Sequence, residues 1–142
     1  AWAGLDPMMA AAEIESGARL FYRKPEANTW GVLNVREAFA AEHPELVLRV
    51  LTVYDRARAW ASAHPQELRA MLVAAMKLPD AVIARQLERT DLSDGRIGDA
   101  QSATIIEAGR ALQAAGVLDA GVDVGATTKA LIDPSYVSRM PA

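Results

Sequence analysis

Two histidines, three tryptophans and a few carboxylates are the side chains of this sequence that could take part in chemistry. His43 and His64 each precede a proline at a predicted helix start, and no spacing brings a further metal ligand or a base to either one. We interpret both as exposed residues of helix caps. Glu13 and Glu15 lie two positions apart on a predicted helix, so they point to different faces and form a poor acid–base pair. The sequence therefore predicts neither a catalytic nor a metal site.

The tryptophans point to binding instead. Trp2 and Trp30 each lie beside or within a predicted strand, next to a small residue, where an indole could line a ligand cleft. The alternative is that both indoles pack in a core, which composition favours. Trp60 lies within an amphipathic helix and is interpreted as a packing residue. Asp6 could contact a ligand, although a helix cap is the commoner role for an aspartate before a proline.

Composition excludes several classes of protein. The 142 residues are 51% hydrophobic and carry a net charge of −3, so no basic field favours nucleic acid as a partner. The absence of cysteine excludes disulfides, thiolate metal sites and a cysteine nucleophile. No glycine-rich phosphate loop and no apolar run of roughly 20 residues is present. We expect a soluble globular chain without a cofactor.

Helix and strand signals divide the chain unevenly. Short strands are predicted at 18–22 and 29–33, with a loop at 23–28 between them. Proline, aspartate and glycine signals then predict helices at 8–15, 35–42, 67–77, 80–89, 99–115 and 127–132, and a further helix that starts at 43–45. In the helix that starts at 43–45, apolar residues keep to one stripe at near-helical spacing. Its members are Leu46, Val47, Val50, Leu51, Tyr54 and Ala61. The expected fold class is α/β, helix-rich, with two strands that must pair with something else.

An ordered series of segments resembles a known family. The opening Ala1-Trp2-Ala3-Gly4-Leu5-Asp6-Pro7 looks like the strand-to-helix segment of periplasmic binding proteins for aliphatic sulfonates, nitrate and taurine. The similarity continues through Gly17-Ala18-Arg19-Leu20, Asn34-Val35-Arg36-Glu37-Ala38-Phe39 and Ala41-Glu42-His43-Pro44-Glu45-Leu46-Val47. It extends to Trp60-Ala61 with His64-Pro65 and ends at Leu131-Ile132-Asp133-Pro134-Ser135-Tyr136. Family members are much longer, and the aspartate expected before Ala1 is missing, so we expect a C-terminal portion.

The resemblance implies a fold, a function and a site. It implies the C-terminal part of a two-lobed type II periplasmic-binding-protein fold, with residues 1–28 ending the second lobe. Residues 29–142 would then hold the return crossing at the hinge and helices that pack on the first lobe. The implied protein binds a sulfonate, taurine or nitrate-like anion outside the cytoplasm, delivers it to an ABC permease, and is not an enzyme. The ligand-binding candidates are Trp2, Asp6, Asn28 and Trp30.

Two other functions are compatible with parts of this pattern. Pyrimidine synthases of thiamine biosynthesis resemble the same family, but they depend on a cysteine-rich segment that this chain does not contain. A free-standing helical interaction domain would also explain the series of helices. Cooperative folding of the chain by itself, without an N-terminal remainder, would favour that last interpretation.

Overall fold

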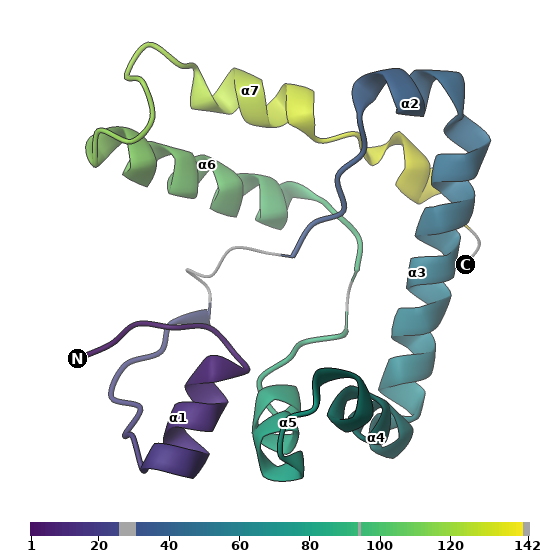
Figure 1. Cartoon of the computed structure of the whole chain (residues 1–142). Helices are drawn as coiled ribbons and strands as arrows, with labels where there is room; N and C mark the ends of the chain where they lie inside the picture. Colours follow the sequence, from purple (N-terminus) through teal and green to yellow (C-terminus); the bar gives the residue numbers. More distant parts are fainter. Residues whose placement is uncertain (26–30, 94, 141–142) are drawn as a thin grey trace. The chain divides into compact units, whose positions relative to one another are not determined.

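The protein is described by a computed structural model that covers residues 1–25, 31–93 and 95–140. The regular elements in these ranges are helices (Figure 1). In chain order they are α1 (Met8–Ser16), α2 (Glu37–Glu42), α3 (Pro44–Ala63), α4 (Pro65–Met76), α5 (Asp80–Leu87), α6 (Asp99–Ala114), α7 (Val124–Leu131) and the 3-10 helix η2 (Pro134–Arg139). Within the described ranges, we find no helix with the length and apolar character that a bilayer crossing requires.

The predicted α/β fold with two short N-terminal strands is wrong. Residues 18–22 and 31–33 are irregular, and no strand occurs in the part of the chain that the structure describes. A strand needs a neighbouring strand to satisfy its N–H and C=O groups, and no strand is present to do this among the described residues. The large apolar side chains that suggested a strand at 18–22 are exposed: Phe21 by 74% and Tyr22 by 71%. Composition alone was therefore misleading at these positions.

Helix α1 begins and ends at the predicted signals. The N-cap residue is Pro7, one position later than expected, but the Asp6 carboxylate still accepts a hydrogen bond from the Ala10 N–H of the first turn at 3.0 Å. Gly17 ends the helix with φ of 62°, the left-handed conformation that glycine adopts without a Cβ penalty. The two ends of α1 are thus encoded locally.

The two His-Pro pairs make nearly identical helix junctions. His43 joins α2 to α3, and His64 joins α3 to α4, with φ near −130° at both. Each imidazole packs on the aromatic residue four positions earlier. The His43 ring is 4.9 Å from Phe39, edge to face, and the His64 ring stacks on Trp60 at 5.0 Å. The prediction that these histidines lie at helix ends is confirmed.

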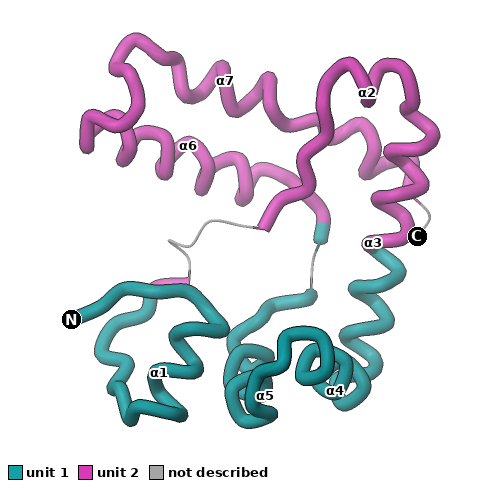
Figure 2. The backbone as a smooth tube through the Cα atoms, in the orientation of Figure 1, with its two compact units in different colours: residues 1–23, 55–95 teal, residues 24–54, 96–142 magenta. Residues whose placement is uncertain are grey.

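Two compact units make up the chain (Figure 2). The first contains residues 1–23 and 55–95, and there α5 packs against both α1 and α4. Its interior is small, and Ala10, Val82 and Ile83 within it are 0% exposed. Arg58 attaches the segment around Leu92 to α3, because its Nη1 donates to the Leu92 carbonyl oxygen at 2.8 Å. This unit contains Trp2 and Asp6.

The second unit contains residues 24–54 and 96–142. Helices α6 and α7 lie side by side in it, joined by a loop that Gln113 stabilises through hydrogen bonds to the Asp119 and Val122 carbonyl oxygens. Helix η2 is tied to the start of α3 by an ion pair of 2.5 Å between Arg139 and Glu45. The proposed division at residues 28 and 29 falls within 26–30, outside the described residues, and stays a prediction.

Candidate functional site

The Trp2 indole lies on the surface, folded back over Gly4. It is 58% exposed, so it is not a core residue. A Cβ atom placed on Gly4 would be 1.9 Å from Trp2 Cη2, a distance that no pair of carbon atoms tolerates. Only glycine therefore allows the ring to rest against this backbone. One face of the indole thus lies against Gly4, while much of the ring remains available to contact a ligand.

Asp6 is a structural carboxylate in a partly buried ion cluster. Its Oδ1 accepts the Ala10 N–H and lies 3.5 Å from Nη1 of Arg89, which follows α5. The other terminal nitrogen of that guanidinium, Nη2, donates to Glu13 of α1. The side chains of Arg89, Asp6 and Glu13 are 11%, 17% and 20% exposed. Water screens such a cluster less than it screens a surface pair, so the cluster connects the start of α1 to the end of α5.

A carboxylate in this position does not attract an anion. Asp6 has the same charge sign as a sulfonate, and its Oδ1 already has a hydrogen-bond donor and a cation beside it. Its contribution to a binding site would be to hold the Trp2 segment in place. Two further predicted ligand contacts, Asn28 and Trp30, lie outside the described residues. Of the four predicted site residues, the structure describes Trp2 and Asp6, which lie six and two positions before the first residue of α1.

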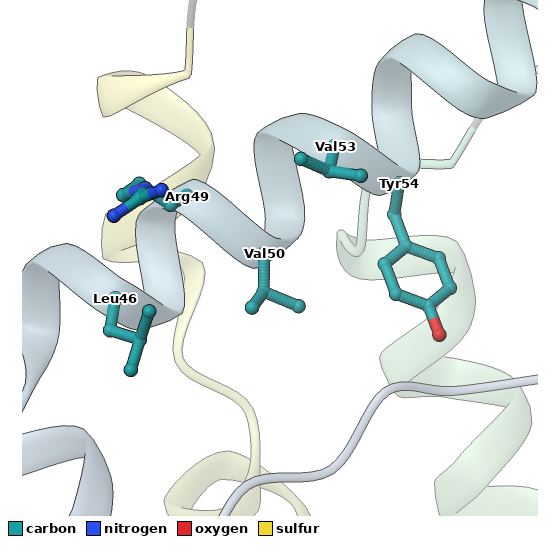
Figure 3. A pocket seen from close by; sticks show the side chains of 5 residues that line it. All are labelled: Leu46, Arg49, Val50, Val53 and Tyr54. Atoms are coloured by element: carbon teal, nitrogen blue, oxygen red, sulfur yellow. The ribbon is translucent and has the colours of Figure 1, made fainter.

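A second feature is an exposed apolar row on the first half of α3, which we call the α3 face. It consists of Leu46, Val50, Val53 and Tyr54, with Arg49 at its edge, and encloses a shallow hollow of about 310 Å³. In Figure 3 the side chains of Leu46, Val50 and Tyr54 project from the same side of the helix. The four apolar residues are 44%, 46%, 61% and 56% exposed. Three of them belong to the apolar stripe predicted for this helix, in which Val47 is buried, with 8% exposure.

The hollow on the α3 face is too open to capture a small anion. Small-molecule sites bury most of their ligand between several structural elements, and this hollow is lined by one helix. Four apolar side chains in successive turns instead form the kind of ridge that packs against another helix or a sheet. We therefore interpret the α3 face as a packing surface.

Catalytic chemistry receives no support from the titratable groups with shifted pKa values. The Arg69 guanidinium donates to Asp80 and lowers the pKa of that carboxyl. Hydrogen bonds from Ser93 and Ser135 lower the pKa of Asp91 and Asp133 in the same way. These are exposed ion pairs and turn-stabilising carboxylates, which serve structure. Within the described ranges, no group of three or more histidine or acidic residues could hold a metal ion.

Comparison with known proteins gives one informative relationship. A scan of protein families finds no match, and no solved structure matches this chain. A protein of Bacillus subtilis named "Putative aliphatic sulfonates-binding protein" is 26% identical to the chain over 101 residues. The matched stretch is 70% of this chain and 30% of that protein. The chain is therefore distantly similar to a binding protein, and it spans less than a third of that relative's length.

Proposed function

We propose that this chain is part of a solute-binding component of an ABC importer, one that captures a small organic anion of the aliphatic sulfonate class. The observation that carries the proposal is the 26% identity, extending over 101 residues, to a protein named for binding aliphatic sulfonates. An importer component of this kind works outside the cytoplasm and transfers its solute to a membrane permease. Capture requires a cleft that closes and desolvates the solute, without any covalent step.

Trp2 supplies the apolar part of the proposed site. An alkanesulfonate combines a hydrocarbon chain with an anionic head group, and the exposed indole face suits the hydrocarbon. Asp6 then contributes by position, and Trp30 and Asn28 remain proposed contacts. The head group needs N–H donors or cations, and backbone N–H groups at helix N-termini are the usual source. We propose that most of these donors come from a further, N-terminal part of the same protein.

The α3 face supports a role for such an additional part. Leu46, Val50, Val53 and Tyr54 expose an apolar ridge whose shape fits helix packing. Exposed rows of this kind commonly mark an interaction surface. We propose that the remainder of the protein covers this face, and that binding is a property of the whole protein.

Calorimetric titration of the whole protein tests the proposed function. Methanesulfonate, butanesulfonate and hexanesulfonate form a series in which only the alkyl chain grows. If the chain lies on an apolar wall, each methylene should improve affinity about fourfold, from about 0.8 kcal/mol per buried methylene. Alkyl carboxylates of equal length and inorganic sulfate serve as controls for the head group and for charge alone. A folded protein that binds none of the sulfonates would contradict the proposal.

The Trp2→Ala variant tests whether Trp2 forms the apolar surface on which the alkyl chain lies. Removing the indole should weaken butanesulfonate binding roughly ten- to a hundredfold and flatten the dependence on chain length. Trp2→Phe should lose much less, since a smaller aromatic surface remains. Because Trp2 is 58% exposed, neither change should lower thermal stability by more than a surface substitution does. Unchanged affinity in Trp2→Ala would remove this residue from the site.

A further inference from the structure

Arg89 is the point at which three separate segments of the first unit meet. Its Nη2 donates to Glu13 on α1, and its Nη1 lies 3.5 Å from Asp6 at the start of that helix. Its backbone carbonyl oxygen accepts a hydrogen bond from Arg23 Nη2 at 3.4 Å. The Arg89 guanidinium thus connects the N-terminal segment and α1 to the end of α5, and its carbonyl oxygen adds the stretch after α1.

The cluster is buried enough for its geometry to matter. The Arg89 side chain is only 11% exposed, and its Nη1 atom is buried without a hydrogen bond in the described part of the protein. The nearby Asp6 carboxylate is what compensates that charged nitrogen. A planar guanidinium presents its donors in a fixed fork, so it holds two carboxylates in defined relative positions, which an ammonium group does less well.

The Trp2 indole is connected to this cluster by a short stretch of chain. Asp6 is held by the Ala10 N–H and by Arg89, and only three residues separate it from Trp2. Within that stretch the indole rests on Gly4, at a separation that leaves no room for a Cβ. Leu5, which lies between them, is also tied to α1, because its carbonyl oxygen accepts the Met9 N–H at 3.0 Å. The position of Asp6 therefore bears on where the chain places the indole.

We propose that Arg89 is a positioning residue for Trp2: through Asp6 it holds the indole in the orientation in which the ring binds the solute. This rests on the proposed function for the binding step, while the effect on the indole itself is independent of any ligand. The expected consequence is a loss of affinity on removal of the guanidinium, without any contact between Arg89 and the solute.

The test uses the whole protein with every tryptophan except Trp2 replaced by phenylalanine. Acrylamide quenching of Trp2 fluorescence then reports the exposure of this ring with no ligand present. Arg89→Met should raise the quenching constant and weaken butanesulfonate binding roughly three- to thirtyfold. Arg89→Lys should restore part of both losses, because the charge returns without the fork. Arg110→Met is the matched control, since that arginine is 66% exposed and pairs only with Glu107 within the described residues.

Asp6→Asn supplies a second variant in case Arg89→Met does not fold. The amide oxygen can still accept the Ala10 N–H, so α1 keeps its cap, but the charge that faces Arg89 is gone. Its quenching constant and affinity should shift in the same direction as those of Arg89→Met. In the Trp2→Ala background, Arg89→Met should cause little further loss of affinity.

The two proposals fail in different ways. Absence of sulfonate binding by the unmodified folded protein would overturn the proposed function, and with it the role of Arg89 in binding. Quenching of Trp2 that stays unchanged in a folded Arg89→Met or Asp6→Asn protein would overturn the positioning role, whatever the protein binds. The positioning role would also be overturned if Arg89→Met reduced affinity equally in the unmodified protein and in the Trp2→Ala background.

Discussion

Replacement of Val50 and Val53 by alanine tests whether the α3 face is covered in the whole protein. The two residues are 46% and 61% exposed, so about half of each side chain remains to be buried by a covering partner. At about 0.8 kcal/mol per buried methylene, the double change should cost the whole protein about 1.5 kcal/mol more than it costs this chain by itself. In this chain the loss of partial burial is offset by the better helix propensity of alanine, roughly 0.5 kcal/mol per residue.

The assay is urea unfolding followed by circular dichroism, applied to the whole protein and to this chain. A difference of about 1.5 kcal/mol is about tenfold in the ratio of folded to unfolded protein, which the shift in midpoint resolves. Val47→Ala is the control on the same helix. Val47 is only 8% exposed, so its loss should cost roughly 2 kcal/mol in both proteins.

A cysteine-labelling experiment also tests whether the α3 face is covered, and it does not require a cooperative unfolding transition. The chain contains no cysteine, so Val53→Cys introduces a single reactive thiol. Alkylation of this thiol should be fast in the isolated chain. It should be much slower in the whole protein, after any cysteines in the rest of that protein are replaced by serine. Equal labelling rates, together with equal costs of the Val50→Ala and Val53→Ala double change, would refute the packing argument.

Three other predictions follow from individual contacts. Gly109→Ala should lower stability by roughly 1–3 kcal/mol, because its Cβ would lie 2.5 Å from Cγ1 of Val124, and Val124→Ala should restore part of the loss in thermal melts. The pKa of Asp80 is lowered when folded, so its contribution is present above the unfolded pKa, near 4, and is lost as the pH falls through the folded pKa. Arg69→Met should therefore reduce the acid sensitivity of the urea midpoint, and an unchanged pH profile would contradict this. Produced by itself, the chain should bind a hydrophobic dye and melt broadly, whereas a sharp transition in a monomer would favour an independent helical domain.

Local sequence signals predicted most helices. Helix α1 begins beside Asp6 and ends at Gly17, and the two His-Pro pairs separate α2, α3 and α4 as expected. Such signals act within a few residues, because caps and φ restrictions depend on the neighbouring backbone. One helix starts earlier in the structure than its sequence signal indicated. The last α-helix was predicted at 127–132, but it begins at Val124 because the Asp123 side chain accepts the Ala126 N–H.

Whether the predicted strands form, and whether an apolar helix face is buried, depends on parts of the protein outside the local segment. Aromatic and branched residues at 18–22 look like a strand, but a strand forms only where another strand pairs with it. In the same way, the period of α3 predicts an apolar row, yet cannot say whether a partner covers it. The structure leaves Leu46, Val50 and Tyr54 exposed.

The candidate site shows the same division between local sequence and tertiary structure. The sequence identified Trp2 and Asp6 from their types and their place before a helix. It gave no signal for Arg89, which lies 83 positions after Asp6 and meets it only because α5 packs on α1. The amino-acid sequence determines which side chains are able to bind a ligand, cap a helix or carry a charge. Long-range packing decides which of them meet, because contacts between distant segments depend on the whole arrangement of helices.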